Sequence, residues 1–260
     1  MTFTFYKYQG TGNDFVIIDN RNTDLQLNMS QVKKICDRHF GIGADGLMLM
    51  NKHTSYDFEM KYYNADGDEG TMCGNGGRCM IQFAYDSGMH KREYSFTAID
   101  GEHKALIEDN GWIDLKMQDV NTVEINEYSN YVLNTGSPHL IKPVTGIWNY
   151  DVVKEGREIR YNKRFAKVGI NVNFTEVDEE GNICVRTYER GVENETLSCG
   201  TGVTAAALVF AHNENGFNRV EVKTLGGRLA VEFDKLGETK FNNIWLCGPA
   251  VQTFKGEIEI

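Results

Sequence analysis

The sequence predicts an α/β (α+β) protein with two similar, pseudo-symmetric lobes, each a small curled sheet or barrel around a central helix. Three observations lead to this prediction. First, 260 residues are enough for two lobes of about 120 to 130 residues each. Second, short strand-like runs alternate with a few helical segments in both halves. Third, a cysteine twice precedes small residues and an apolar run, at Cys73-Gly74-Asn75-Gly76 and at Cys199-Gly200-Thr201-Gly202.

Most of the N-terminal half is predicted to form strands. One helix is expected from Ser30 to His39, with Ser30 as its N-cap and apolar residues at helical spacing. A second helix is expected to begin at Cys73 and to end near Ser87 and Gly88, because glycine commonly terminates helices. The predicted strands cover residues 3–8, 14–19, 47–51, 58–63, 93–98, 104–108 and 112–117.

The C-terminal half repeats this plan. A helix that runs from acidic to basic residues is predicted at about 150–160. The helix after Cys199 should be buried on all sides, because residues 203–211 are almost entirely apolar. Strands wrapped around it would make it the axle of a small sheet or barrel. The predicted strands cover residues 131–135, 171–177, 183–189, 219–224, 228–233, 243–246 and 251–260.

Charge and hydropathy argue against several functions. The formal net charge is −10, and both nucleic acids and anionic membrane surfaces favour basic patches instead. No run of about 18 uninterrupted apolar residues occurs, so we expect no membrane span. The N-terminus lacks the apolar segment of a secretory signal. We therefore expect a cytoplasmic protein.

The six cysteines are expected to remain thiols. Three disulfides are possible by number, but a chain without an export signal is a poor candidate for them. Metal binding is weakly supported, because there is no C-x-x-C pair and the histidines show no ligand spacing, so we expect no metal. Four of the cysteines are interpreted as small core residues, namely Cys36, Cys79, Cys184 and Cys247.

Cys73 and Cys199 are interpreted differently, because each opens a helix and the arrangement is repeated. At a helix N-terminus, the unpaired N–H groups and the positive end of the dipole favour a thiolate. Glycine at a helix start lowers stability by roughly 1 kcal/mol relative to alanine. Gly200 and Gly202 therefore indicate a close approach of the backbone to another group, such as a small anion.

Two opposed thiols without a metal or nucleotide suit two kinds of chemistry. In a 1,1-proton transfer, a thiolate removes a proton from one face of a carbon while a thiol delivers one to the other face. Two close thiols do not both ionise easily, so such a pair would share one proton at rest. The alternative is a redox pair. The local sequence leaves both open.

Several short motifs lie along the chain: Gln9-Gly10-Thr11-Gly12-Asn13-Asp14-Phe15, Asn64-Ala65-Asp66-Gly67, Met72-Cys73-Gly74-Asn75-Gly76-Gly77-Arg78-Cys79, Tyr188-Glu189-Arg190-Gly191, Glu195-Thr196-Leu197-Ser198-Cys199-Gly200-Thr201-Gly202 and Gly248-Pro249-Ala250. Together they resemble the motifs of diaminopimelate epimerases. They follow that family's order from residue 9 to residue 250, and as a set they are highly specific. The resemblance implies two α/β lobes, each a curled mixed sheet around a central helix. It also implies an isomerase that interconverts LL- and meso-2,6-diaminopimelate without a cofactor, on the route to lysine and peptidoglycan.

The same resemblance assigns roles to particular residues. Cys73 and Cys199 would be the two acid/base residues. The residues after each cysteine would donate hydrogen bonds to the substrate α-carboxylate and stabilise the carbanion; they are Gly74, Asn75, Gly200 and Thr201. The side chains expected to hold the ammonium and carboxylate groups are Asn13, Asn64, Asn171, Glu189 and Arg190. His139 and Glu189 are expected to tune the site, although His139 would serve equally to hold its loop.

Two residues depart from the family pattern. Gly46 stands where some members have glutamine, and Ser137 stands where asparagine often precedes Pro-His. Both leave the contacts at the distal end of the substrate open.

The two lobes are predicted to span residues 1–118 with 250–260, and residues 119–249. The family implies a homodimer. The net charge and the absence of a long apolar run lead us to expect no nucleic-acid and no membrane partner.

Three functions stay open at this point. The first is diaminopimelate epimerase. The second is a related two-cysteine racemase for proline, hydroxyproline or another amino acid, which should lack the signatures at residues 64–67 and 189–190. The third is a thiol redox or ligand-binding protein in which Cys73 and Cys199 form a regulatory disulfide.

Overall fold

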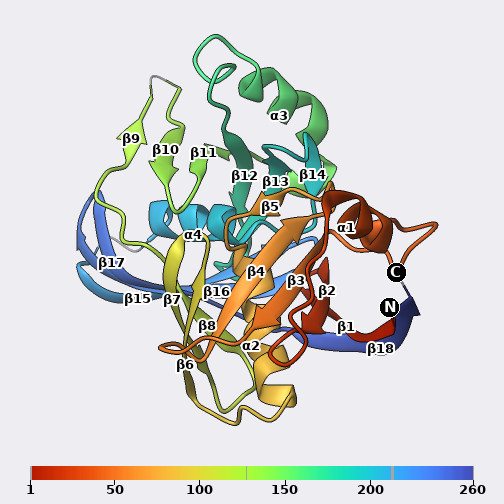
Figure 1. Ribbon diagram of the computed structural model, residues 1–260. Coiled ribbons are helices and arrows are strands. Elements are labelled where there is room, and N and C mark those ends of the chain that lie inside the picture. Colours follow the sequence, from red (N-terminus) through yellow and green to blue (C-terminus); the bar gives the residue numbers. More distant parts are fainter. Residues whose placement is uncertain (1, 127, 212–213, 260) are drawn as a thin grey trace. The chain divides into compact units, whose positions relative to one another are not determined.

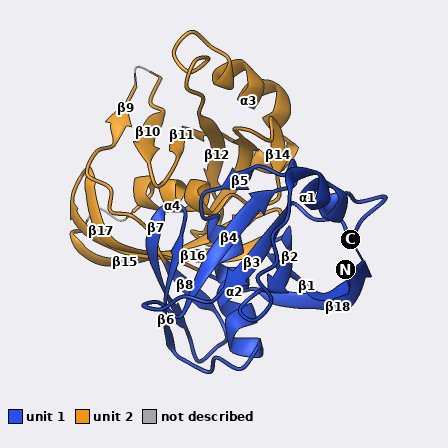
Figure 2. Cartoon of the chain, viewed as in Figure 1, with its two compact units in different colours: residues 1–115, 248–260 blue, residues 116–247 orange. Residues whose placement is uncertain are grey.

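A computed structural model describes residues 2–126, 128–211 and 214–259 (Figure 1). Two compact units divide the chain, as Figure 2 shows: unit 1 comprises Met1–Leu115 and Gly248–Ile260, and unit 2 comprises Lys116–Cys247. The predicted fold class is confirmed, because each unit combines a mixed sheet with a central helix. Within the described part of the chain, no helix combines the length and the apolarity that crossing a bilayer requires.

The sheet of unit 1 has parallel and antiparallel pairs. Strand β2 is parallel to β3, and β4 is parallel to β6, whereas the other neighbours are antiparallel. Strand β5 (Glu69–Gly70) pairs with β4. In spatial order, the remaining strands are β18 (Val251–Glu259), β1 (Thr2–Gly10), β2 (Asn13–Asp19), β3 (Gly46–Asn51), β4 (Phe58–Asn64), β6 (Glu93–Ala98), β7 (Gly101–Ile107) and β8 (Ile113–Lys116).

Unit 2 repeats this topology strand by strand. Strand β11 is parallel to β12, β13 is parallel to β15, and the short β14 (Asn194–Thr196) pairs with β13. Strands β11, β12 and β13 therefore correspond to β2, β3 and β4. The order is β9 (Glu124–Ile125), β10 (Tyr131–Asn134), β11 (Pro138–Pro143), β12 (Asn171–Val177), β13 (Ile183–Glu189), β15 (Gly216–Thr224), β16 (Gly227–Gly237) and β17 (Lys240–Gly248).

Each unit also has one central helix, which begins directly after a cysteine. Helix α2 (Gly74–Asp86) contacts β1, β2, β3 and β7, and α4 (Gly200–Val209) contacts β10 to β13, β15 and β16. Helix α2 ends as predicted, with Ser87 as C-cap and Gly88 at φ +99°. In α4 residues 203–208 are all buried, which confirms the expected axle over most of the helix. Residues 209–211, the end of the run predicted to be buried on all sides, are only half-buried.

A second helix covers the opposite face of each sheet. Helix α1 (Met29–Cys36) packs on apolar residues of β2 and β3, and α3 (Val152–Arg160), preceded by the 3-10 turn η1 (Ile147–Asn149), packs on β12 and β13. Because side chains alternate along a strand, Val172 and Phe174 of β12 face the α3 side. Asn173 points to the other side, where Gly202 of α4 lies against its amide group.

The prediction for α1 was wrong at both ends. Its N-cap is Asn28 rather than Ser30, because Asn28 and Gln31 form a reciprocal capping box with hydrogen bonds of 3.0 and 2.9 Å. The helix stops at Cys36, since the Asp37 carboxylate accepts the N–H groups of the next two turn residues, at 2.7 Å each.

The predicted strands are confirmed, with ends that differ by a few residues. Ile260, the last residue of the predicted strand 251–260, lies outside the described residues. Strand β11 was not among the predicted strands, because Pro138 and His139 were interpreted as part of a loop beside the site. Pro138 is the first residue of that strand, where a missing N–H is tolerated. The short strands β5, β9 and β14 were also missed.

Candidate functional site

Both reactive-cysteine candidates are helix N-caps, as predicted. Cys73 and Cys199 have extended backbone angles, and their carbonyl groups accept the first helical N–H bonds, from Gly77 at 2.7 Å and from Val203 at 2.8 Å. Cys73 is half-buried, and Cys199 is 8% exposed. Each unit thus places a sulfur atom beside the orphan N–H groups of its central helix.

All six cysteines lie among the described residues, and each is a thiol rather than half of a disulfide. The four that were interpreted as core residues are buried, as expected. Burial raises the pKa of Cys36 to about 12, and it also raises the pKa values of Cys79 and Cys184. These thiols are therefore poorly suited to act as nucleophiles or bases.

Around Cys73, side-chain amides form a short chain. The Cys73 Sγ lies 3.6 Å from Asn13 Oδ1, and Asn75 Nδ2 donates to the same oxygen at 3.3 Å. The other end of the Asn13 amide donates to Asp45 Oδ2 at 2.6 Å. Asn13 and Asn75, both predicted site residues, are thus brought to Cys73.

A fully buried arginine holds this arrangement from within the helix. Arg78 is 0% exposed, and its guanidinium donates to Asn75 Oδ1 at 3.0 Å, to Thr11 Oγ1 at 3.4 Å and to the Gly74 carbonyl at 3.4 Å. Burying a cation requires such hydrogen bonds. No role was predicted for Arg78, although a charged residue directly before the apolar run Cys79-Met80-Ile81 of a predicted helix could have indicated one.

An ion-pair network lies directly beside Asn13. Asp14 contacts Lys7 and Arg38, at 2.7 Å each, and Arg38 also contacts Asp45 at 2.8 Å. Burial by itself would raise the pKa of the Asp14 carboxyl, but the hydrogen bonds and charges of Arg38 and Lys7 hold it at about 2. The network fixes Asp45, which orients the Asn13 amide.

The departure at Gly46 has a steric explanation. A Cβ atom at this position would lie 2.5 Å from the ring of Tyr62 and 2.7 Å from the carbonyl of Tyr63. The Tyr62 ring therefore takes the space that a longer side chain at residue 46 would need. Asn64, a predicted substrate contact, ends β4 directly opposite Gly46.

Around Cys199, hydroxyl groups and an imidazole replace the amides. The Cys199 Sγ lies 3.5 Å from Thr201 Oγ1, which is 2.9 Å from His139 Nε2 and 3.2 Å from Ser137 Oγ. Ser137 Oγ and His139 Nε2 are 2.9 Å apart. Ser137, the second departure from the family pattern, is therefore a member of this network.

His139 is completely buried, and its other nitrogen has a partner that the sequence analysis missed. Asn173 Nδ2 lies 3.0 Å from His139 Nδ1, and Thr187 Oγ1 donates to Asn173 Oδ1 at 2.9 Å. Burial lowers the pKa of His139 to about 3, and the Arg190 charge acts in the same direction, so the imidazole is neutral. The available signal was Asn173 between the apolar residues Val172 and Phe174 of a predicted strand.

Asn171 joins three strands through its side chain. Its Nδ2 donates to Ser137 Oγ at 3.0 Å and to the Pro138 carbonyl at 3.2 Å, and its Oδ1 accepts the Arg190 N–H at 2.8 Å. Glu189 Oε2 accepts from Thr196 at 2.9 Å. These residues form the rim of the Cys199 network in unit 2.

The close packing around Gly202 explains why a glycine is needed at this position in the first turn of α4. A Cβ at this position would lie 2.2 Å from Asn173 Oδ1 and 3.4 Å from His139 Cε1. The close approach inferred from the sequence is confirmed, and the group approached belongs to the chain itself. At the equivalent Gly76, an added Cβ would lie 3.2 Å from Met48 Sδ and 3.5 Å from the Phe15 ring.

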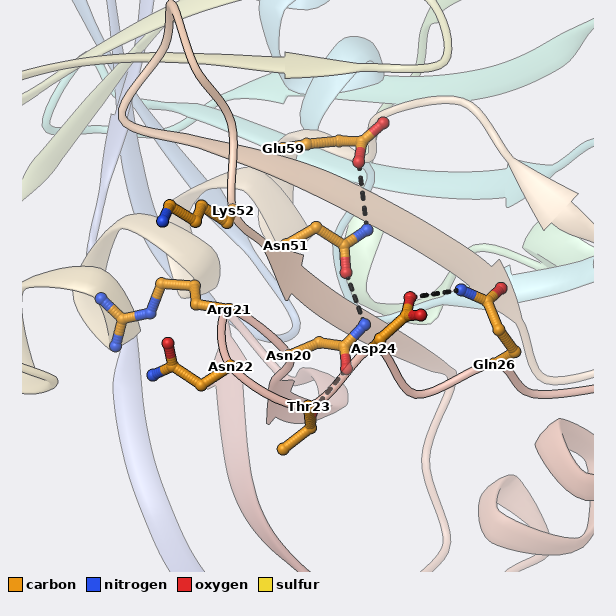
Figure 3. Close-up of a pocket in the computed structure, with 9 residues that line it drawn as sticks. All are labelled: Asn20, Arg21, Asn22, Thr23, Asp24, Gln26, Asn51, Lys52 and Glu59. Atoms are coloured by element: carbon orange, nitrogen blue, oxygen red, sulfur yellow. Dashed lines mark hydrogen bonds between the residues drawn. The ribbon is translucent and has the colours of Figure 1, made fainter.

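A separate polar pocket of about 540 Å³ lies in unit 1 (Figure 3). Its side chains bond mainly to one another, as between Asn20 and Asn51 at 2.7 Å and between Asn51 and Glu59 at 3.1 Å. The lining residues include none of the predicted site residues; they are Asn20, Arg21, Asn22, Thr23, Asp24, Gln26, Asn51, Lys52 and Glu59.

The fold is shared with solved structures of low sequence identity. A PhzF-family phenazine biosynthesis protein from Bacillus anthracis has a TM-score of 0.78 at 16% identity, covering 100% of both chains. A hydroxyproline epimerase from Agrobacterium vitis has a TM-score of 0.71 at 13% identity, covering 99% of this chain and 92% of that one.

Sequence relatives are much closer. The diaminopimelate epimerase of Flavobacterium psychrophilum is 48% identical over 259 residues, which cover 97% of this chain and 99% of the relative. That of Chlorobaculum tepidum is 40% identical over 260 residues, with 96% and 99% covered. The profile of the diaminopimelate epimerase family matches residues 5–123 and 131–252.

Fold and relatives together define an isomerase of the epimerase and racemase class, which confirms the predicted enzyme class. Within that class, the chain belongs to the diaminopimelate epimerase family.

Proposed function

We propose that the protein interconverts LL- and meso-2,6-diaminopimelate by proton transfer at the α-carbon, with Cys73 and Cys199 as the two acid/base residues. The observation that carries the proposal is the repeated device. Two units of the same topology each begin their central helix with a cysteine N-cap. Full-length similarity to diaminopimelate epimerases supports the choice of this substrate.

The chemistry needs one thiolate and one thiol on opposite faces of one carbon. The thiolate sulfur takes the α-proton, and the electron pair stays on the carbon and delocalises into the α-carboxylate. The thiol then delivers its proton to the opposite face, which inverts the centre. The removed proton stays on the first sulfur, and the second sulfur becomes the thiolate. No oxidant, reductant or cofactor enters this balance.

Helix-start N–H groups suit the carboxylate on which the negative charge develops. The residues after each cysteine, Gly74-Asn75 and Gly200-Thr201, lie in the first turns of α2 and α4. Donors already in place when charge forms stabilise the transition state more than the ground state. We assign the same role to these residues here.

The polar groups of the substrate need further partners. We assign them to Asn13 and Asn64 of unit 1 and to Asn171, Glu189 and Arg190 of unit 2, with His139 and Glu189 tuning the site. Arg190 offers a planar fork that matches a carboxylate. The half-buried side chains of Glu189 and Arg190 are consistent with ligand access.

The same proposal covers the cellular setting. Diaminopimelate epimerisation would place the protein in lysine and peptidoglycan-precursor biosynthesis. Six cysteines kept as thiols suit a reducing, cytoplasmic compartment.

A homodimer is also proposed; exposed Val251 and Phe254 on β18 offer apolar surface for it. Sedimentation of the purified protein would measure its mass in solution.

Solvent exchange tests the activity. In heavy water, the protein should incorporate deuterium at the α-carbon of diaminopimelate while converting the LL isomer to the meso isomer. Proline and hydroxyproline serve as control substrates and should not exchange. Exchange into proline alone would identify the related racemase, and no exchange with any substrate would leave a redox or binding function.

A further inference from the structure

The two sulfur atoms meet opposite kinds of hydrogen-bonding group. We propose that in the resting protein Cys73 holds the proton as a thiol, that Cys199 is the thiolate, and that Asn173 is a positioning residue that maintains this state. The inference deepens the proposed function and depends on it for its catalytic meaning. The direction of each hydrogen bond follows from groups that can only donate or only accept.

The chain of amides at Cys73 ends in an acceptor. The Asp45 carboxylate accepts, so the Asn13 amide turns its Nδ2 toward it, at 2.6 Å. The guanidinium of Arg78 donates, so Asn75 turns its Oδ1 toward Arg78 and its Nδ2 toward Asn13. Both constraints leave Asn13 Oδ1 beside the Cys73 sulfur, at 3.6 Å. A carbonyl oxygen accepts from a thiol and repels a thiolate, so the proton stays on Cys73.

At Cys199, a first chain of donors starts from the backbone of Arg190. Its N–H donates to Asn171 Oδ1 at 2.8 Å, which leaves the Asn171 Nδ2 to face the Pro138 carbonyl and the Ser137 hydroxyl. Because Ser137 Oγ accepts from Asn171, its own hydrogen is available to Thr201 Oγ1 at 3.2 Å.

A second chain starts from Asn173. Its amide faces the Leu140 carbonyl at 3.2 Å, and a carbonyl only accepts, so this end of the amide is the NH₂ group. The same NH₂ group donates to His139 Nδ1 at 3.0 Å, while Thr187 holds the Asn173 oxygen. A neutral imidazole that accepts at Nδ1 carries its hydrogen on Nε2. The Nε2–H group of His139 therefore faces Ser137 Oγ and Thr201 Oγ1, at 2.9 Å each, and toward both it acts only as a donor.

Both chains converge on the hydroxyl of Thr201. Ser137 Oγ faces two donors, Asn171 and His139, so its own hydrogen is directed to Thr201 Oγ1. Because His139 Nε2 also only donates, the Thr201 hydroxyl hydrogen is directed to the third neighbour, Cys199 Sγ, at 3.5 Å. An O–H group that donates to sulfur stabilises the thiolate. The Thr201 hydroxyl beside Cys199 Sγ thus donates, whereas the Asn13 amide oxygen beside Cys73 Sγ accepts.

Unit 1 lacks the second chain. The parallel pair Phe15 and Gly46 corresponds to His139 and Asn171, and the antiparallel pair Met48 and Tyr62 corresponds to Asn173 and Thr187. Buried polar groups are costly to desolvate. Unit 1 has apolar Phe15 and Met48 where unit 2 has His139 and Asn173, so the fold does not need an imidazole and an amide at these two positions. Because His139 and Asn173 occur in the unit of Cys199 and not at the matching positions of unit 1, we link this pair to the Cys199 thiol.

The nearby charges include one that opposes the assignment. Buried Arg78 favours ionisation of Cys73, whereas the Asp45 carboxylate disfavours it. At the rim of the Cys199 network, the positive charge of Arg190 favours a thiolate and the negative charge of Glu189 disfavours it. Were the Arg78 charge to outweigh the acceptor at Asn13, the thiolate would be on Cys73, so the two outcomes are distinguishable.

The first measurement locates the thiolate in the substrate-free, full-length protein. At pH 7, the ultraviolet thiolate absorbance should disappear in Cys199→Ala and persist in Cys73→Ala. The opposite pattern overturns the assignment. This measurement does not use diaminopimelate. A failure of deuterium exchange into that substrate would therefore disprove the proposed function without deciding which cysteine holds the proton.

The second measurement tests Asn173. Asn173→Leu frees the His139 tautomer, so the rate of Cys199 alkylation by iodoacetamide should fall at least tenfold, with the Cys73 rate unchanged as an internal control. Nitrogen-15 spectra of labelled histidine should show the Nε2–H tautomer in the wild type and its loss in the variant. A folded Asn173→Leu protein with an unchanged Cys199 rate overturns the role of Asn173.

Two further variants on neighbouring strands complete the test. Thr187→Val removes the hydroxyl that holds the Asn173 amide and should lower the Cys199 rate in the same direction. If Asn173→Leu does not fold, an unchanged rate in Thr187→Val overturns the proposal instead. Thr175→Val is the matched control, because Thr175 is buried on the same face of β12 and its hydroxyl has no hydrogen-bond partner among the described residues. Its rates should equal those of the wild type, and a tenfold fall would assign the effect to packing.

Discussion

At the start of α2, Gly76 packs against a methionine sulfur and a phenylalanine ring; at the start of α4, the equivalent Gly202 packs against an asparagine and a histidine. The backbone device is the same, with a cysteine N-cap and glycines in the first turn. The side chains that face it differ in polarity and in hydrogen-bonding direction. Topological duplication therefore supplies two similar positions for a thiol, and the surroundings make the two thiols chemically unequal.

The buried charge is another difference between the units. Five residues after its cysteine, α2 has the fully buried Arg78, whereas α4 has Thr204, which donates to the Gly200 carbonyl at 3.0 Å. Unit 1 orients its amides with a cation and a carboxylate, and unit 2 orients its hydroxyls with neutral groups. The following predictions test whether this difference matters.

The largest expected effect is on turnover. Cys73→Ala and Cys199→Ala should each reduce epimerisation by about 10³-fold or more, because both a base and an acid are required. Circular dichroism should show that both variants fold. Deuterium exchange into each isomer measures the loss. Near-native turnover in either variant would contradict the assignment of two bases.

The next effect concerns stability of the helix starts. Arg78→Met should destabilise the protein by about 1–3 kcal/mol, because it leaves the buried Asn75 oxygen and the Thr11 hydroxyl without their donor. Thr204→Val, its matched control in unit 2, should lose about 1 kcal/mol or less, since one local hydrogen bond is removed. Urea unfolding compares them. Equal losses would show that the buried cation adds nothing to the neutral design.

Glycine replacement compares the two helix starts directly. Gly202→Ala should cost about 1–3 kcal/mol, because the added Cβ would lie 2.2 Å from Asn173 Oδ1. Gly76→Ala should cost less than about 1 kcal/mol, because the nearest atom is a flexible methionine sulfur at 3.2 Å and alanine favours the helix. Thermal unfolding of both variants gives the ranking, and a reversed ranking would contradict it.

The smallest effect depends on pH. The pKa of Asp14 is lowered to about 2 in the folded protein, so its ion pairs stabilise the fold above the unfolded pKa and lose that effect as the pH falls toward 2. Asp14→Asn should therefore lower stability by about 1 kcal/mol at pH 7. The difference from the wild type should shrink between pH 4 and about 2. A difference that persists at the lowest pH would point to packing rather than charge.

Much of the local structure could be predicted from the sequence. The central helices, their cysteine starts and most strands follow from patterns of nearby residues, such as the apolar run at 203–208 and the glycine at residue 88. Errors arose where a nearby competitor changed the outcome. Asn28 rather than Ser30 caps α1 because its partner Gln31 is correctly spaced, and β11 begins at a proline that resembles a turn residue.

The sequence by itself determined that a cysteine opens a helix in each half, because caps, glycines and apolar periodicity act over a few residues. Only the tertiary structure decided what each sulfur faces. Asn13 reaches Cys73 from β2, and His139 and Asn173 reach α4 from β11 and β12. Such partners are far apart in the chain and are brought together by strand register and the alternation of side chains, which no local pattern specifies.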